Sequence, residues 1–316
     1  MRDIKFIEVT SEIGAGTRGA SLGIGAVKVA SINSGSNFFR DYNAVEVETE
    51  NEILFSETKT PYAKYIEQVY MMENRMCEVV SKVIKSDQFP FVLAGDHSTA
   101  AGTIAGIKTE NPDKRLGVIW IDAHADLNTP YTTPSGNMHG MPLAMVADID
   151  NLENKINEPS ETTINIWNDL KNIGSSGAKI NLEDIVFIAA RALEKAEQEL
   201  VNKYNITNFD TEQVREKGVE NIVSETLNIL EGCDIIYVSF DVDSIGSEIS
   251  IGTGTPVPNG LTVDEAIQLN KLFVANEKVC AWEIVEVNPT LDTNNVMANS
   301  ALKVMEVVRE ELENRL

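Results

Sequence analysis

Short apolar segments alternate with amphipathic helical segments along most of the chain, and this alternation constrains the fold more than any other feature of the sequence. The apolar segments have strand length and cover residues 4–9, 89–93, 116–121, 185–189, 235–240 and 279–285. The helical segments cover residues 62–85, 99–108, 193–204, 219–230, 263–273 and 296–313. Strands that alternate with helices are typical of a mostly parallel sheet with helices on both faces. We therefore expect an α/β fold with three α-β-α layers, formed by a single domain over residues 1–316.

Two segments fall outside this alternation. Residues 14–25 carry five glycines, but their spacing matches neither a P-loop nor a dinucleotide-binding fingerprint. We expect a loop near the rim of an active site there. Residues 151–177 are rich in Asn, Glu, Ser and Gly, and we expect a connecting excursion rather than a linker between domains.

Acidic residues and histidines follow four of the predicted strands at the point where each strand ends. The strings are Gly95-Asp96-His97, Asp122-Ala123-His124-Ala125-Asp126, Asp241-Val242-Asp243 and the single residue Glu286. In open parallel sheets, ligands bind at the carboxyl ends of the strands. We therefore expect all four strings to converge on one site.

The spacing within two of these strings favours a shared metal site. Asp122, His124 and Asp126 are two residues apart, so an extended backbone would place all three side chains on one side, and Asp241 and Asp243 repeat the pattern. Adjacent buried carboxylates repel one another and lose their hydration, but divalent cations reverse this cost. The sequence therefore predicts a site that holds positive charge.

The histidines strengthen this prediction. The chain has only three, His97, His124 and His139, and all lie within 43 residues. Imidazoles with several carboxylates and no thiolate suit manganese or a similar divalent ion, and two such ions activate water to hydroxide near neutral pH. A serine nucleophile is the rival interpretation, because Ser98 follows His97, but we expect Ser98 to cap a helix.

Taken together, the motifs resemble the arginase/ureohydrolase family. The matching strings are GAGTRG at 14–19, AGDHS at 94–98, WIDAHADLNTP at 120–130, SGNMHG at 135–140, FDVD at 240–243, GTGTP at 252–256 and EVNP at 286–289. The resemblance implies an arginase-like sheet of about eight strands, two Mn²⁺ ions per subunit and a homo-oligomer, a trimer or a hexamer. It also implies hydrolysis of the guanidinium group of L-arginine to L-ornithine and urea, with a hydroxide that bridges the metals as nucleophile.

The resemblance further assigns roles to individual residues. One metal is expected on His97, Asp122, Asp126 and Asp241, and the second on Asp122, His124, Asp241 and Asp243. His139, Glu286 and Asp126 are the expected catalytic residues, with His139 as proton shuttle and Glu286 as acceptor for the guanidinium. The expected substrate-binding residues are Asn128, Ser135 and Asn137 at the α-carboxylate, and Glu194 and Glu197 at the α-amino group.

The chain departs from the family pattern in two places. The family string Arg-Asp-x-Asp-Pro becomes Arg191-Ala192-Leu193-Glu194-Lys195, so Glu194 stands where an aspartate would face the substrate. Ser244-Ile245-Gly246-Ser247 replaces Gly-Leu-Asp-Pro. Agmatinase, guanidinobutyrase and formiminoglutamase activities therefore stay open, as do, more remotely, a binuclear metallophosphoesterase and a metal-binding protein without activity.

Charge and cysteine content exclude other classes. The net charge of -23, from 26 basic and 49 acidic residues, disfavours nucleic acid and anionic membranes as partners and favours a small cationic substrate. Cys77, Cys233 and Cys280 are too few and too scattered for a disulfide framework. Without an apolar membrane span, and with charged residues in the first seven positions, we expect a soluble cytoplasmic protein.

Overall fold

The chain forms one parallel sheet of eight strands, in the computed structural model that describes residues 3–40 and 42–316. The strands are β1 (Asp3–Val9), β2 (Ala44–Glu46), β3 (Gln88–Ala94), β4 (Leu116–Ile121), β5 (Ile185–Ile188), β6 (Thr207–Phe209), β7 (Ile235–Asp241) and β8 (Val279–Val285). Their order across the sheet is β2-β1-β3-β8-β7-β4-β5-β6, and every pairing is parallel. The last two strands in sequence, β7 and β8, therefore lie at its centre.

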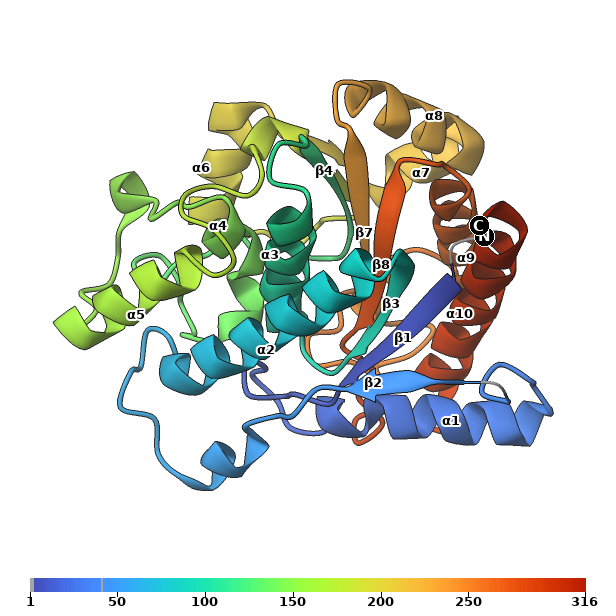
Figure 1. Ribbon diagram of the computed structural model, residues 1–316, viewed down its shortest axis with the longest axis horizontal. Coiled ribbons are helices and arrows are strands. Elements are labelled where there is room, and N and C mark those ends of the chain that lie inside the picture. The colour runs from blue at the N-terminus through green and yellow to red at the C-terminus, as the bar shows by residue number, and fades with distance from the viewer. Residues whose placement is uncertain (1–2, 41) are drawn as a thin grey trace.

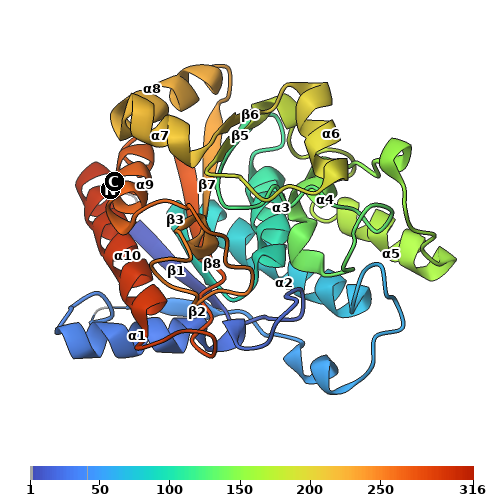
Figure 2. The same ribbon diagram turned by 180° about the vertical axis from the view of Figure 1, so that it is seen from behind.

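Helices cover both faces of the sheet. They are α1 (Gly23–Ser34), α2 (Ile66–Lys85), α3 (Ala100–Glu110), α4 (Pro142–Val146), α5 (Glu161–Lys171), α6 (Lys195–Tyr204), α7 (Thr211–Lys217), α8 (Val219–Ile229), α9 (Val263–Val274) and α10 (Val296–Arg315). Figure 1 shows α2 and α3 in front of the sheet, and Figure 2 shows α9 and α10 on the reverse side. The expected three-layer α-β-α fold is confirmed.

Two apolar cores, one on each face, hold the layers together. Successive side chains of a strand point to opposite faces. In β4, Val118 and Trp120 pack into the core shared with α2 to α6, whereas Ile119 and Ile121 pack into the core shared with α1 and α7 to α10. All four side chains are fully buried. A strand that must satisfy both cores is apolar at every position, which explains its continuous apolar sequence.

All six strands expected from the sequence are present, and their bounds differ by one or two residues at most. The expectations failed for short or polar elements. The helix α1 begins at Gly23, inside the segment expected to be a loop, and α5 lies inside the segment expected to be an excursion. The expected helix at 62–85 begins only at Ile66, because Tyr65 has a left-handed backbone (φ 54°).

Met1 and Arg2 lie outside the described residues. They belong to the amino-terminal segment whose charged residues led us to expect no secretion signal. Within residues 3–40 and 42–316, no helix combines the length and apolar character needed to cross a bilayer.

Candidate metal centre and active site

The four adjacent strands β3, β8, β7 and β4 bring the expected metal ligands and Glu286 to one edge of the sheet. The carboxylates and imidazoles converge at the strand ends as expected, but the expected extended backbone through Asp122, His124 and Asp126 was wrong. β4 ends at Ile121, so Asp122, His124 and Asp126 do not share one extended strand. Asp126 has a left-handed backbone (φ 48°), and this turn redirects its side chain toward His97.

His97 lies at the centre of a first cluster. Its Nδ1 atom is 3.0 Å from Oδ2 of Asp122, 3.2 Å from Oδ2 of Asp126 and 3.1 Å from Oδ2 of Asp241. None of these contacts has hydrogen-bond geometry at Nδ1, and Oδ2 of Asp122 is also buried without a hydrogen-bond partner. The histidine nitrogen and three carboxylate oxygens therefore face a common point.

A second cluster adjoins the first and shares Asp122 with it. Nδ1 of His124 is 3.0 Å from Oδ2 of Asp243 and 3.5 Å from Oδ1 of Asp122. Ligand atoms of His97, Asp122 and Asp241 lie within 4.8 Å of one another, and the same limit holds for Asp122, His124 and Asp243. These are two donor sets with one carboxylate in common.

The charges of the two clusters favour cations. Burial and the charges of Asp243 and Asp122 raise the pKa of Asp241 well above its ordinary value. Burial and Asp122 raise the pKa of Asp126 to about 6, and they also raise the pKa of Asp243. Burial would raise the pKa of Asp122 as well, but the neighbouring histidines lower it. The site thus holds more buried negative charge than its own imidazoles balance.

These observations satisfy what a pair of divalent metals requires. Oxygen and imidazole donors converge, buried donor atoms lack hydrogen bonds, and the clusters contain no thiolate. The residues grouped as possible metal ligands are His97, Asp122, His124, Asp241 and Asp243, all from the expected set. Two details differ from the expectation at the 4.8 Å limit: Asp126 belongs to neither group, although its Oδ2 lies 3.2 Å from Nδ1 of His97, and Asp241 is grouped with His97 but not with His124.

Asp96, not Ser98, caps the helical segment that follows β3, so the expected role of Ser98 was wrong. The Asp96 side chain accepts the backbone N–H of Ser98 at 2.9 Å and the hydroxyl of Ser98. It also accepts the N–H of Gly14 at 3.1 Å, which attaches the glycine-rich loop to the site. A hydroxyl bound to this carboxylate, on the residue after a candidate metal ligand, has no histidine partner for nucleophilic catalysis.

His139 and Glu286 form a pair beside the clusters. Nδ1 of His139 is 2.9 Å from Oε1 of Glu286, which also accepts the backbone N–H of His97 at 3.0 Å. Oε2 of Glu286 is buried and has no partner. Burial would lower the pKa of His139, but the charge and hydrogen bond of Glu286 raise it to about 9. The pair therefore offers a protonated imidazole and a carboxylate oxygen with free acceptor capacity.

A cavity of about 200 Å³ connects the clusters with the predicted substrate-binding residues. Asn128, Ser135, Asn137, Glu194 and Glu197 all line it, together with His139. A larger cavity of about 710 Å³ lies at the amino ends of β7 and β8 and contains none of the predicted site residues.

The two glutamates differ in position. Glu194 is the N-cap of α6, exposed at the cavity, and its Oε2 accepts from Nδ2 of Asn128 at 3.2 Å. Glu197 is buried, and its two oxygens accept the backbone N–H groups of Leu127 and Glu194 at 3.0 and 2.9 Å. Glu197 thus supports the loop after β4, whereas Glu194 can face a ligand.

The sequence interpretation missed two residues that touch the clusters. Oγ of Ser239 is 2.7 Å from Nε2 of His97, so the serine can accept Nε2–H and leave the Nδ1 lone pair toward the carboxylates. The hydroxyl of Thr255 donates to Oδ2 of Asp243 at 2.9 Å. For Ser239 a signal existed: it lies two residues before Asp241 on β7, and strand alternation puts both side chains on one face.

Comparisons with known proteins agree with this geometry. The sequence profile described as "Arginase family" matches residues 2–310. The arginase of Brevibacillus brevis is 32% identical over 313 residues, which cover 97% of each chain. Among solved structures, the arginase of Bacillus caldovelox superimposes with a TM-score of 0.81 at 31% identity and 98% coverage of both chains. The Entamoeba histolytica arginase, solved in complex with L-ornithine, has a TM-score of 0.81 at 25% identity, covering 98% of this chain and 99% of that chain.

Proposed function

The chain belongs to the arginase family and is a hydrolase of amidines, and from this premise we propose that it is a manganese-dependent ureohydrolase that converts L-arginine to L-ornithine and urea. One observation carries the proposal: two donor sets that share Asp122 lie beside the His139–Glu286 pair. A metal-binding protein without activity would have no use for that pair.

Manganese is the proposed metal because the donors are hard. One ion would be held by His97, Asp122, Asp126 and Asp241, and the other by Asp122, His124, Asp241 and Asp243. Carboxylate-rich sets with imidazole and no thiolate suit Mn²⁺ better than structural zinc. When bound, a pair of such cations supplies Lewis-acid polarisation and the activation of water.

Glu286 is proposed to hold the guanidinium group. Burial would raise the pKa of Glu286, but the charge and hydrogen bond of His139 lower it, so the side chain is an anion. A carboxylate matches the planar fork of a guanidinium, and Oε2 of Glu286 is free to accept one of its N–H groups. The left-handed backbone of Glu286 (φ 67°) turns the chain at the end of β8.

His139 is proposed to move the proton that the reaction requires. Hydrolysis forms a C–O bond at the guanidinium carbon, breaks the C–N bond to the substrate side chain, and places a proton on the departing amine nitrogen. An imidazole that contacts a carboxylate can carry that proton near neutral pH. Glu286 holds His139 in place through the 2.9 Å contact.

L-arginine is the proposed substrate because the far end of the cavity offers partners for an amino acid. Asn128, Ser135 and Asn137 present neutral polar groups for the carboxylate, and Glu194, supported by Glu197, presents an anion for the amino group. The Entamoeba relative was solved with L-ornithine, which has the same end as arginine. Ala192 and Glu194 depart from the family pattern, so agmatine and 4-guanidinobutyrate belong in the same test.

The setting of the enzyme is also part of the proposal. We take the chain as a single ureohydrolase domain in a cytoplasmic homo-oligomer, a trimer or a hexamer, with no nucleic acid or membrane partner. The net charge of -23 supports the last point, because such a protein repels polyanions and anionic lipid.

The decisive experiment measures urea release from L-arginine, agmatine and 4-guanidinobutyrate by the Mn²⁺-loaded protein. Preferred turnover of arginine supports the proposal, and preferred turnover of agmatine or guanidinobutyrate would replace the substrate while keeping the metal centre. Release of phosphate from an aryl phosphate, without turnover of any guanidinium compound, would favour a metallophosphoesterase.

A further inference from the structure

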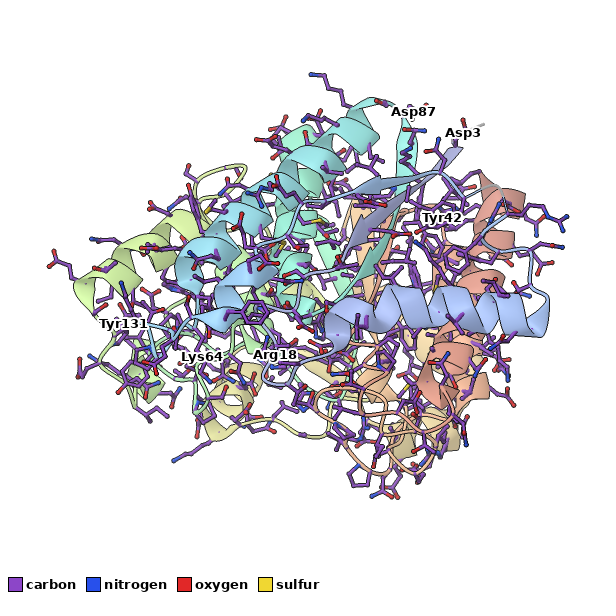
Figure 3. The ribbon with its side chains drawn as sticks, turned by 90° about the horizontal axis from the view of Figure 1, so that it is seen from below. Asp3, Arg18, Tyr42, Lys64, Asp87 and Tyr131 are labelled. Carbon is purple, nitrogen blue, oxygen red and sulfur yellow. The ribbon has the colours of Figure 1, made fainter. Side chains whose placement is uncertain are left out.

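Lys64 carries an unbalanced positive charge and contacts Asn137, a residue that lines the cavity. It lies just before α2, where Figure 3 shows it, and its Nζ donates to Oδ1 of Asn137 at 2.9 Å. Over the part of the chain that the structure describes, no carboxylate lies within 4.0 Å of this ammonium. A half-buried lysine without an anionic partner is unexpected in a protein with 49 acidic and 26 basic residues, because carboxylates far outnumber cations.

The contact determines which way the Asn137 side chain faces. A lysine ammonium only donates hydrogen bonds, so Asn137 must turn its carbonyl oxygen toward Lys64 and its NH₂ group away. Asn137 lines the cavity, and Gly16 packs against its Nδ2 so closely that a Cβ on Gly16 would lie 2.5 Å away. Lys64 thus orients the side-chain amide of a residue that lines the cavity.

The backbone keeps Lys64 in this position. Its N–H donates to the carbonyl of Gly136 at 2.8 Å. Gly136 has a φ of 76°, and a Cβ there would lie 1.8 Å from the carbonyl oxygen of Pro61. Only glycine permits this approach, so the segment before α2 is held against the segment that carries Ser135 and Asn137.

We infer that Lys64 is a specificity-determining residue that selects substrates with an α-carboxylate, through its own charge and through the orientation of Asn137. This inference rests on the proposed function and deepens it. Glu194 lines the cavity and carries the opposite charge, and Lys64 contacts Asn137 of the cavity wall, so the site has an anion in its wall and a cation directly behind it. That combination matches the amino and carboxylate groups of an α-amino acid.

A substrate without the carboxylate would satisfy only half of this arrangement. Agmatine, which is arginine without its carboxylate, could pair with Glu194, but Lys64 would keep no anionic partner. Selection then comes from the attraction of Lys64 to the carboxylate of arginine, which agmatine lacks. The prediction is a loss of selectivity, not of catalysis, when Lys64 is neutralised.

The test compares Lys64→Met and Lys64→Arg with the wild type in kcat and KM for L-arginine and agmatine. For Lys64→Met we expect the KM for arginine to rise by about tenfold to a hundredfold, the loss typical of a charge-assisted hydrogen bond, with a smaller change in kcat. The kcat/KM for agmatine should stay within about twofold, and Lys64→Arg should keep most of the selectivity. Lys217→Met is the control, because Lys217 is exposed and pairs with Glu225 between α7 and α8, so the kinetics of this variant should equal those of the wild type.

Binding without turnover gives an independent readout. L-ornithine should bind the Mn²⁺-loaded Lys64→Met variant about tenfold to a hundredfold more weakly than the wild type, whereas putrescine, which lacks the carboxylate, should bind both alike. Should Lys64→Met fail to fold, as judged by circular dichroism, Lys64→Gln carries the same comparison. An equal loss for arginine and agmatine, or no loss for either, overturns the inference while arginase activity stands. A wild type that turns over no guanidinium compound overturns the proposed function instead.

Discussion

Replacing Asp241 with asparagine should change the stability of the metal-free and the metal-loaded protein in opposite directions. Carboxylate oxygens of Asp241 and Asp122 lie within 4.8 Å of each other. At an effective dielectric constant of 20, Coulomb's law gives a repulsion of about 3.5 kcal/mol at that distance. His97, 3.1 Å from Asp241, offsets part of it. Burial and the remaining repulsion nevertheless keep the pKa of Asp241 well above its ordinary value.

The sign of the effect follows from proton linkage. A carboxyl group with a raised pKa binds its proton more tightly in the folded protein, so the free energy of unfolding falls as the pH rises through the interval between the ordinary and the raised pKa. Asparagine has nearly the same shape and no charge. At neutral pH, Asp241→Asn should therefore raise the free energy of unfolding of the metal-free protein by up to about 3 kcal/mol, because it removes the repulsion between Asp241 and Asp122 and loses only the attraction of His97.

Bound metal should reverse the order of stability, so that the wild type becomes more stable than Asp241→Asn. Four carboxylates, Asp122, Asp126, Asp241 and Asp243, carry four negative charges, which two divalent cations balance when the imidazoles are neutral. Mn²⁺ at a hundred times its dissociation constant should stabilise the wild type by about 2.7 kcal/mol for each site. The variant lacks a ligand expected to serve both ions, so it should gain much less and retain less metal.

The assay is urea denaturation with a chelator and with MnCl₂, together with metal content by atomic emission. Asp184→Asn is the control, because Asp184 is buried outside the clusters and accepts two hydrogen bonds from Arg115 at 2.7 and 2.8 Å. It should lose stability equally with and without metal. If Asp241→Asn destabilises the metal-free protein as the control does, and Mn²⁺ stabilises both variants alike, the reasoning is wrong.

Three further predictions concern other parts of the molecule. His139→Gln should keep its metal content but lose about 10² to 10⁴ in turnover of arginine, as expected for a proton-transfer residue; loss of the metal would contradict that role. Gly136→Ala should lower the free energy of unfolding by about 2 to 4 kcal/mol in urea titrations, because alanine is strained at a φ of 76° and its Cβ would meet the carbonyl of Pro61; an unchanged midpoint would refute the argument. Burial lowers the pKa of Lys179 to about 8, so the unfolded chain binds more protons than the folded one from about pH 8 to the ordinary lysine value. Across that range the stability of the wild type should rise with pH relative to Lys179→Met, and parallel pH profiles would exclude this linkage.

The sequence predicted the central strands well because their burial dictates their composition. A strand such as β4, with a helical layer on each face, must be apolar at every position. At the sheet edges this constraint is weaker. β2 and β6 have three residues each and are partly exposed, so they carry no such pattern. The helix α1 was not predicted, because two glycines lie in its first turn and no side chain caps its amino end.

The candidate metal ligands were predictable because their motifs follow strand ends, and parallel strands bring those ends together. Contacts between loops left no comparable signal. His139 and Glu286 are separated by 147 residues, and Lys64 and Asn137 by 73. Such pairs depend on how loops pack once the sheet has formed, and a single sequence contains no periodicity that reveals them.

The strand order has a consequence for how the protein acquires its metal. β8 is the last strand in the sequence, yet it lies between β3 and β7 in the sheet. It therefore joins the strand that precedes His97 to the strands that precede the Asp122 and Asp241 motifs. Until that strand inserts, β3 and β7 expose unpaired edges that can aggregate, and His97 stays apart from the carboxylates that follow β4 and β7. A metal held by His97 together with Asp122 and Asp241 would therefore bind only after β8 has completed the sheet.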